Sequence, residues 1–496
     1  MIKQFVAIVR NPDIQFIRDL FYLAGGQFIS KVVGFFLFVY LARILPPEDY
    51  GMVEYLLAIT GFAIIFVDFG LGRVGVRERM VSSENDNIVN EIPAIRGVFS
   101  LIVTPVVILG IFVSTEDQTA RILGSLFATT ILLNSYKQEW LMQSLESLDN
   151  VALGQLLRIL VMAGLTVVLV ASPDDLIWLG LAELLSVAVW MAFFVWFQTR
   201  SGFSILSKVS WPRFKVLVAK AAPLGLNSIV WGVVQYFPPI LIANVSGLEQ
   251  AAFYSAGQRI VLALQSISYT YHFNLYATLI RRLEQGGEQL VHLNLASIKV
   301  VAWAVFGPVI FISGYGSEIY SLTFGEAYHR SGAVLSILIF VFPLHILSGH
   351  HRWILTAMGQ TNAVFISGAA GSAVSVVLGS ILIVNFGATG GAISIVAATA
   401  TVWALAIVLC NRHGVKFKFV SQIVRPMTVA VILLAVAKSI GSIPWELKLT
   451  AVFVLYYLIG LIVDRKLVTE IKYLAYSKMD SGPKETQKSA AQISGN

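Results

Sequence analysis

Six of the basic side chains inside long apolar stretches of the sequence, where a charge is costly, are candidates for a function. They are Lys31, Arg96, Lys137, Arg158, Arg259 and Lys438. If these stretches cross a membrane, a lysine or arginine near the middle costs about 2.5–3.5 kcal/mol on insertion scales. Such residues are kept because they have a function or a partner, and in a cavity of low dielectric constant they bind anionic groups strongly. They are therefore the first candidates for a functional site.

Lys31 lies in the middle of the first apolar stretch. On a helix it shares a face with Gln27 and Gly34, four residues before it and three residues after it. This face is less apolar than the others, so we expect it to point into the protein. The alternative is a structural pair, or a side chain that reaches out to an interface.

Four other cations have different local contexts. Arg158 lies roughly two helical turns into its stretch, and we expect it to line a cavity. Lys137 is two residues from Glu139, a spacing that places the two on different faces of a helix, and both are candidates for the mouth of a cavity. Arg96 and Lys438 are predicted to lie at interfaces, Arg96 as an anchor and Lys438 with its side chain turned outward.

Two acidic residues inside the apolar stretches, Asp68 and Glu183, are candidates for ion coupling. A carboxylate at membrane depth can exchange a proton or bind Na⁺ when it is exposed to the two sides in turn. Glu183, in LAELLSV, is the better candidate, because Asp68, in VDFGLG, has a structural role at the end of a helix as its alternative.

Three prolines, Pro223, Pro238 and Pro239, lie in one apolar stretch over residues 217–244. Proline cannot donate a helical hydrogen bond and is a common cause of kinks. We therefore expect this helix to be broken or bent and to act as a hinge.

The composition places all of these residues in a membrane protein. Hydrophobic residues make up 57% of the 496 residues and charged residues 13%, whereas soluble domains carry about 25% charged residues. The stretches approach the length of about 20 residues that a spanning helix needs, and they lack the alternation of barrel strands. We predict an all-α polytopic membrane protein of about fourteen transmembrane helices. The stretches cover residues 20–43, 51–72, 93–114, 121–143, 151–171, 176–198, 217–244, 252–279, 296–314, 332–350, 363–385, 390–411, 427–441 and 447–463.

The loops between the stretches predict the orientation. With the N-terminus in the cytoplasm, most lysines and arginines of the loops fall on the cytoplasmic side, as the positive-inside rule requires. The formal net charge of +7 is therefore interpreted as orientation and not as nucleic-acid binding. We expect no removable signal peptide before the first stretch, and the outer loops are short.

Two pairs of segments indicate an internal repeat. LARILPPEDYGMV at 41–53 is similar in pattern to IANVSGLEQAAFY at 242–254, and LDNVALGQLL at 148–157 to QTNAVFISGA at 360–369. Six helices in each repeat predict two parallel lobes related by a pseudo-twofold axis along the membrane normal. The predicted division is a cytoplasmic N-terminus (1–19), an N-lobe (20–198), a basic cytoplasmic linker (199–216), a C-lobe (217–411), two further helices (427–463) and a disordered cytoplasmic tail (464–496).

Other chemistries find no support in the motifs. The spacing of His345, His350 and His351 does not place them on one helical face, so no metal site is predicted. No Walker A, nucleophile-elbow or HExxH pattern occurs in the sequence, so we expect neither an enzyme nor a cofactor. The single cysteine, Cys410, excludes an internal disulfide.

Several segments resemble a known family. They are GGQFISKVVGFFLFVYLARILPPEDYGMVEYLLAITGFAIIFVDFGLG (25–72), GLEQAAFYSAGQRI (247–260), LTFGEAYHRSGAVLSILI (322–339) and GQTNAVFISGAAGSAVSVVLGSILIVNFGATGGAIS (359–394). They resemble Wzx-like polysaccharide flippases, the exporters of O-antigen and exopolysaccharide units. These flippases belong to the multidrug/oligosaccharidyl-lipid/polysaccharide (MOP) exporter superfamily. The resemblance extends over about residues 15–465.

The resemblance implies a fold like that of MATE transporters, with two six-helix lobes and two further helices around a central cavity. It implies secondary, ion-coupled transport by alternating access in the bacterial cytoplasmic membrane, with both termini in the cytoplasm. The implied cargo is an oligosaccharide on undecaprenyl diphosphate, and membrane lipids and a polysaccharide polymerase or export machinery are implied partners. In similar flippases basic residues of helices one and eight face the cavity, and this role carries over to Lys31 and Arg259.

Two other functions remain open. A drug or cation antiporter of the same superfamily would favour an acidic cavity, whereas the charges within the stretches lean basic. A membrane glycosyltransferase or polymerase that uses the same lipid carrier could place acids such as Glu48 and Asp49 in an outer loop. It would need a larger outer loop than this sequence has, and an acidic pair after Pro46 and Pro47 is typical of the start of a helix.

Overall fold

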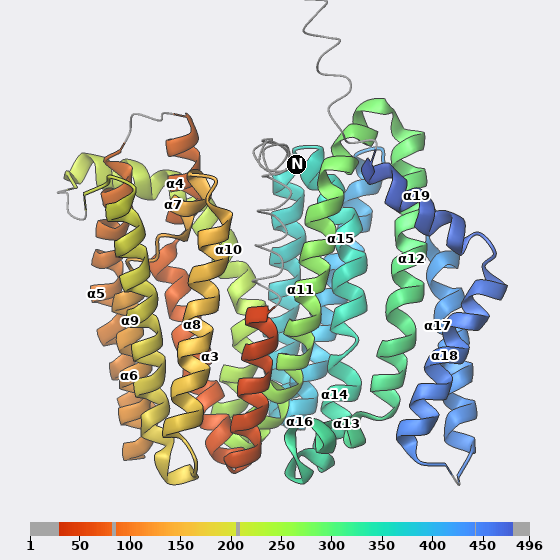
Figure 1. The fold of residues 1–496 in the computed structure, drawn as a ribbon, viewed down its shortest axis with the longest axis horizontal. Coiled ribbons are helices and arrows are strands. Elements are labelled where there is room, and N and C mark those ends of the chain that lie inside the picture. Colours follow the sequence, from red (N-terminus) through yellow and green to blue (C-terminus); the bar gives the residue numbers. More distant parts are fainter. Residues whose placement is uncertain (1–28, 82–85, 205–208, 442, 480–496) are drawn as a thin grey trace, which may run out of the picture. The chain divides into compact units, whose positions relative to one another are not determined.

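The structure is a computed structural model that describes residues 29–81, 86–204, 209–441 and 443–479 (Figure 1), and within these ranges it contains helices and no strand. The first helices are one over residues 29–44, α3 (Pro47–Asp68), α4 (Leu71–Val81), α5 (Ile88–Ser114), α6 (Gln118–Asn134), α7 (Glu139–Ser144), α8 (Leu148–Leu169), η1 (Pro173–Asp175), α9 (Leu176–Arg200) and α10 (Trp211–Ser246). They are followed by α11 (Leu248–Gln285), α12 (Gly287–Gly314), α13 (Gly316–Phe324), η2 (Glu326–Ser331), α14 (Gly332–Leu338), α15 (Val341–Ala357), α16 (Thr361–Arg412), α17 (Val420–Ser439), α18 (Trp445–Val463) and α19 (Leu467–Met479).

Within the described residues each predicted apolar stretch falls on one helix or on two consecutive helices, so the all-α prediction is confirmed. Within the described residues, ten helical segments are long and apolar enough to cross a membrane. Two of the predicted stretches fall together in one of these segments, Thr361–Arg412, and the stretch at 121–143 is divided into α6 and α7. The beginning of the first stretch, up to residue 28, lies outside the described residues.

The gap between the predicted stretches 363–385 and 390–411 corresponds to an interruption of α16. Gly387 has φ 54° and ψ −130°, which is not helical and which L side chains rarely adopt. A Cβ atom added at Gly390 would lie 2.0 Å from the carbonyl oxygen of Leu382. The chain reverses here because glycine at both positions permits the backbone conformation and the close approach.

The described chain falls into two compact units. Unit 1 comprises Met1–Ala263, Ser317–Leu338 and Gly368–Ala398, and unit 2 comprises the remaining segments, Leu264–Gly316, Ile339–Ser367 and Thr399–Asn496. In unit 1, α9 packs against α6 and α8, and α3 packs against α5, α6 and α10. The division into lobes at residues 20–198 and 217–411 stays a prediction.

The starts of α3 and α11, which belong to the two copies of the predicted repeat, meet inside unit 1. A Cβ atom on Gly51 would lie 1.8 Å from the carbonyl oxygen of Leu248 and 3.2 Å from the nitrogen of Ala252. The two backbones are therefore in direct contact. Aromatic rings surround this contact, with Tyr328 packed edge-on against both Tyr50 and Phe253 at centroid distances of 6.2 and 5.6 Å. The cluster closes unit 1 at this end.

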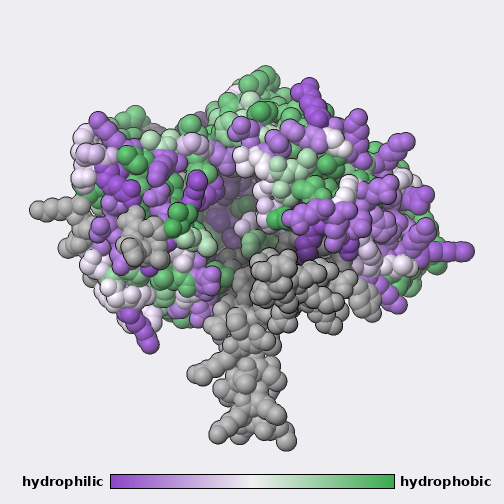
Figure 2. Space-filling model, turned by 90° about the horizontal axis from the view of Figure 1, so that it is seen from above, coloured by the Kyte–Doolittle hydropathy of each residue, from purple (hydrophilic) through white to green (hydrophobic). Residues whose placement is uncertain are grey.

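The opposite end of unit 1 is polar. Figure 2 views the molecule from the side on which α4 and α7 lie in Figure 1, and hydrophilic side chains gather on this face. Glu78 on α4 pairs there with Lys220 at 2.5 Å and with Arg213 at 3.7 Å, both from α10. These cations are among those predicted to face the cytoplasm, and the orientation itself stays a prediction.

Unit 2 is organised around α12, which packs against α15, α17, α18 and α19. The ammonium group of Lys299 on α12 lies 3.4 Å from Asp464, which follows α18, and 3.1 Å from Glu470 on α19. Lys299 and Asp464 are buried, so the ion pairs hold α19 against α12. This helix occupies part of the segment from residue 464 that the sequence predicted to be disordered, and residues 480–496 lie outside the described residues.

The predicted break in α10 is not present. α10 runs as one helix from Trp211 to Ser246 through Pro223, Pro238 and Pro239. Each proline removes only one backbone hydrogen bond, and α10 packs closely against α3, so the remaining bonds hold the helix together. The role of these prolines as a hinge stays a prediction.

The contact at Gly51 can be tested by adding one methyl group. We expect Gly51→Ala to destabilise the protein by about 1–3 kcal/mol, because the new Cβ atom would overlap the backbone at Leu248. The measurement is thermal unfolding of the purified protein in detergent. The control is Gly97→Ala, since a Cβ atom at Gly97 meets nothing within 4 Å. Equal melting temperatures for the two variants would contradict the close contact.

Candidate functional site

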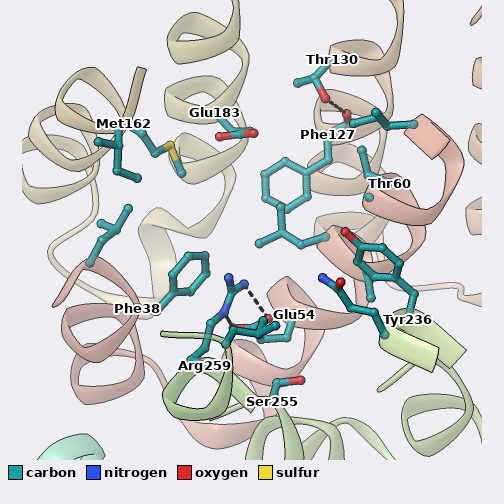
Figure 3. A pocket seen from close by; sticks show the side chains of 18 of the residues that line it. Phe38, Glu54, Thr60, Phe127, Thr130, Met162, Glu183, Tyr236, Ser255 and Arg259 are labelled. Atoms are coloured by element: carbon teal, nitrogen blue, oxygen red, sulfur yellow. Dashed lines mark hydrogen bonds and ion pairs between the residues drawn. The ribbon is translucent and has the colours of Figure 1, made fainter. Parts of the chain in front are cut away.

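All four predicted cavity cations line one cavity of unit 1. The cavity has a volume of about 460 Å³ and is shown in Figure 3, where Arg259 lies beside Phe38 and is joined to Glu54. Five further segments contribute to its wall besides α3 and α11. Its charged lining residues are Lys31, Glu54, Lys137, Arg158, Glu183 and Arg259.

Arg259 and Glu54 form a bidentate ion pair between α11 and α3. Nε of Arg259 donates to Oε1 of Glu54 at 2.9 Å, and one terminal nitrogen donates to Oε2 at 2.8 Å. The hydroxyl of Tyr50 also donates to Oε1, at 2.7 Å. The guanidinium carbon lies 3.4 Å from the ring centre of Phe38. Bidentate geometry and a cation–π contact make this the strongest kind of pair that an arginine forms.

Arg158 on α8 forms a second ion pair with Glu183 on α9. Their closest nitrogen and oxygen are 2.5 Å apart, and the hydroxyl of Ser186 donates to the other carboxylate oxygen at 3.3 Å. Glu183, predicted as an ion-coupling residue, therefore has an arginine partner in this structure. The guanidinium carbon of Arg158 also lies 5.1 Å from the ring centre of Trp190.

Lys137 pairs with Glu139 at 3.1 Å, which corrects the expectation that the two lie on different faces. The expectation assumed a continuous helix, whereas α6 ends at Asn134 and α7 begins at Glu139. The turn between them lets both side chains point the same way. Gln155 donates to Glu139 at 2.9 Å, and Lys137 lies 5.1 Å from the ring centre of Trp190.

Lys31 differs from the other three cations because it forms no ion pair with a described residue. Its side chain is exposed, and it borders both the first cavity and a second one of about 550 Å³. Arg158, Arg259 and Lys137 are near enough to repel it electrostatically. Because each of those three has its own glutamate, the charge of Lys31 is the one left uncompensated.

Asp68 lines a third cavity of about 540 Å³, which shares Lys137 with the first. It is paired with Arg96, whose other terminal nitrogen donates to the carbonyl oxygen of Lys137 at 2.6 Å. Arg96 is buried and is therefore not the interface anchor that the sequence predicted. An arginine near a helix end can bury its charge when a carboxylate lies within reach, and Asp68 on α3 supplies it.

Sequence reasoning found the cations and missed their partners. It assigned no role to Glu54, nor to Trp190, which contacts two of the cations. Tyr50 and Glu54 are four residues apart and hydrogen-bond within one helix, which is the one local signal available. The pair between Glu54 and Arg259 joins residues 205 positions apart and leaves no trace in spacing.

The Arg259–Glu54 pair predicts a measurable coupling. We expect Glu54→Gln and Arg259→Gln each to lower the melting temperature, because each leaves the other charge unpaired in a poorly solvated place. The double variant should lose less stability than the two single variants lose together. The difference, the coupling free energy, should be about 0.5–3 kcal/mol. The control is the same cycle on Lys220 and Glu78, which lie at the surface and should couple by less than about 1 kcal/mol. If the stability losses of the two single variants at Glu54 and Arg259 simply add up in the double variant, the ion pair is contradicted.

The chain is similar in sequence to known transport-related proteins. The family model described as polysaccharide biosynthesis protein matches residues 16–275. A protein of Shigella flexneri named putative O-antigen transporter is 23% identical over 394 residues, which are 75% of this chain and 90% of that protein.

The fold is similar to two solved structures. The lipid II flippase MurJ in an inward closed conformation matches with a TM-score of 0.69 and 14% identity, over 90% of this chain and 99% of that one. An inward-facing multidrug resistance MATE family transporter of the MOP superfamily matches with a TM-score of 0.63 and 15% identity, over 77% of this chain and 94% of that one. At these identities the likeness concerns the fold.

Proposed function

The chain belongs to the polysaccharide biosynthesis protein family, and we propose that it is a flippase which moves a lipid-linked oligosaccharide across a membrane. The observation that carries the proposal is the cavity with four cations, of which Lys31 alone has no glutamate among the described residues. A cavity with one uncompensated positive charge favours an anionic group. The cargo that fits the family and this charge is an oligosaccharide on undecaprenyl diphosphate, whose diphosphate would lie at Lys31.

The paired cations extend the binding site. A diphosphate bound at Lys31 would lie near Arg158 and Arg259, and these arginines can exchange a carboxylate for a phosphate oxygen without losing their hydrogen bonds. The polar side chains of Gln235, Gln258 and Thr130 also line the cavity and would bind sugar hydroxyls. The lipid tail would stay in the bilayer, because its burial in a charged cavity has no benefit.

Alternating access is part of the proposal. The cavities follow α3 from Glu54 to Asp68 and reach Gly72 in α4. The start of α3 instead packs against α11 at Gly51 and Leu248. This arrangement is consistent with a state that is open at the end of α4 and closed at the other end. Export would require the contact at Gly51 to separate and the Arg259–Glu54 pair to break.

The proposed transport is secondary and the protein is not an enzyme, in line with the transporter name of its relative. Glu183 and Asp68 stay candidates for the coupling ion, each beside an arginine. The segments long and apolar enough to cross a membrane make this a multi-pass membrane protein. We place it in the bacterial cytoplasmic membrane with both termini inside, where polysaccharide polymerase or export machinery would act on its product.

The other two functions fit the structure less well. An antiporter for cationic drugs would meet the repulsion of Lys31 at the cavity. A glycosyltransferase or polymerase would need an outer segment to hold an acceptor, and the helix over residues 29–44 is followed at once by α3 at Pro47. Glu48 and Asp49 lie in the first turn of α3, where they complement the helix dipole.

Replacement of Lys31 tests the proposed function. In a bacterial strain that lacks its own flippase, we expect Lys31→Ala to lose surface polysaccharide and Lys31→Arg to keep most of it. A charge-assisted hydrogen bond is worth about 1.5–3 kcal/mol, or about ten- to a hundredfold in affinity. Surface polysaccharide on gels, at equal protein levels in the membrane, is the measurement.

The matched control is Lys438→Ala on α17, a lysine outside the cavity that lies over the ring of Tyr315. It should restore surface polysaccharide as well as the wild type does. Normal surface polysaccharide with Lys31→Ala would sink the assignment of Lys31. If the wild-type chain itself restores none, the proposed function is wrong.

A further inference from the structure

Unit 2 contains a buried group of polar rings where α11, α12 and α15 meet. His272 of α11 and His350 of α15 are almost inaccessible to solvent, at 1% and 0% exposure. Their ring centres lie 4.9 Å apart in an edge-on arrangement, and Trp353 is stacked on His272 at 6.4 Å. Neither histidine takes part in the cavity of unit 1, so their burial needs its own account.

The hydrogen bonds fix the proton on each ring. Nδ1 of His350 lies 3.1 Å from the carbonyl oxygen of Ile346, which only accepts, so Nδ1 carries the proton. Nε2 of His350 must then accept, and the hydroxyl of Ser297 lies 2.8 Å away to donate to it. The hydroxyl of Tyr271 in turn contacts that of Ser297. His350 is therefore fully satisfied as a neutral ring.

His272 is satisfied at only one nitrogen. Its Nδ1 lies 2.8 Å from the carbonyl oxygen of Ser268 and so carries the proton. Its Nε2 is then a bare acceptor, and no described protein group donates to it although the atom is buried. An unpaired buried acceptor costs about 1–3 kcal/mol, and this acceptor is the lone pair of a base that can bind a proton.

The fold holds this imidazole in place with little freedom. A Cβ atom at Gly349 on α15 would lie 2.3 Å from Cε1 and 2.5 Å from Nε2 of His272. Only glycine at this position leaves space for the ring, which is otherwise held by Trp353 and by the bond to Ser268. The Nε2 lone pair therefore has a fixed direction.

We propose that Nε2 of His272 is a proton-binding site that couples transport to the proton gradient. The step adds one proton to the Nε2 lone pair and gives an imidazolium whose Nδ1–H bond to Ser268 is unchanged. This inference rests on the proposed flippase function and names the coupling ion. The titratable and charged groups around His272 are His345, His350 and Arg352 from α15 and Tyr271 on its own helix; α12 contributes Ser297, which does not titrate.

The geometry favours His272 over the carboxylates in the membrane. Glu54, Glu183 and Asp68 each pair with an arginine, and protonation of any of them would break that pair. Protonation of His272 breaks no hydrogen bond, because Nε2 has none to lose among the described residues. A neutral base with a free lone pair can take up a proton without breaking a hydrogen bond. The burial of the ring and the charge of Arg352 oppose the imidazolium and so favour release of the proton.

Transport in inverted membrane vesicles tests the proposal. The vesicles carry the full chain, and the probe is the lipid-linked oligosaccharide that accumulates in a flippase-deficient strain. Respiration makes the vesicle lumen acidic and nigericin removes the gradient, while glycan in the lumen is protected from an added glycosidase. If one proton moves with each transported molecule, a gradient of one pH unit favours transport by about tenfold. We expect nigericin to slow the wild type by up to that factor and to leave His272→Gln unchanged at a low rate.

The control is His329→Gln, an exposed histidine of η2, which should respond to nigericin as the wild type does. A His272→Gln variant that responds like the wild type would overturn the proposal, as would a wild type that transports equally without a gradient. A wild type that protects no glycan at all would instead reject the proposed function. The two failures are therefore distinct.

A second measurement does not need transport. Proton binding by the purified full chain in lipid nanodiscs can be followed by NMR of its labelled histidines. We expect His272→Gln to lack one titrating imidazole signal, and Gly349→Ala, which keeps His272 but displaces its ring, to shift that signal. The proposal is wrong if the titration of His272→Gln contains every signal of the wild type.

Discussion

The ion pair between Arg259 and Glu54 is the interaction on which the cavity depends, because it allows an arginine to lie among apolar helices. An unpaired guanidinium there would be far too costly, and the carboxylate alone would be no better. The pair also joins α11 to α3. Each of these helices is the second helix of one hairpin in the predicted repeat. Directly beside it the backbones touch at Gly51. Charge neutralisation and helix contact are thus achieved at one place, and any opening of that end must undo both.

Three neutral pairs and one lone cation give the cavity a particular kind of selectivity. Arg259, Arg158 and Lys137 each have a glutamate, so among the described residues of the cavity the charge of Lys31 is the one without a counter-charge. In the proposed function, a diphosphate at Lys31 would meet further cations whose present partners are single carboxylates. Exchange of a carboxylate for a phosphate keeps the number of charge-assisted bonds nearly constant. Binding can therefore be specific for the anion without being so tight that release fails.

The sequence predicted the helices and the cations well, because both depend on local composition. A run of about 20 apolar residues spans a membrane whatever surrounds it, and a lysine inside such a run stands out. It predicted the partners poorly, because Glu54 and Arg259 are brought together by tertiary packing, and Lys137 meets Glu139 only because the helix breaks between Asn134 and Glu139. The prolines of α10 show a further limit of local rules. The helix continues through them from Trp211 to Ser246 and packs against α3, while the bend and the hinge expected there stay predictions.

The position of His272 suggests how a proton could affect the cation site without touching it. Coupling requires an element with two arrangements that both sites bias, and α11 carries Arg259 near its start and His272 further along. Arg259 joins this helix to α3 through its bond to Glu54. The ring of His272 packs closely against Gly349 of α15. A proton gained at His272 would change the contact between α11 and α15. An anion that displaces Glu54 would change the contact between α11 and α3. In the proposed coupling, α11 carries both contacts, so each event would alter the cost of the other, as coupled transport requires.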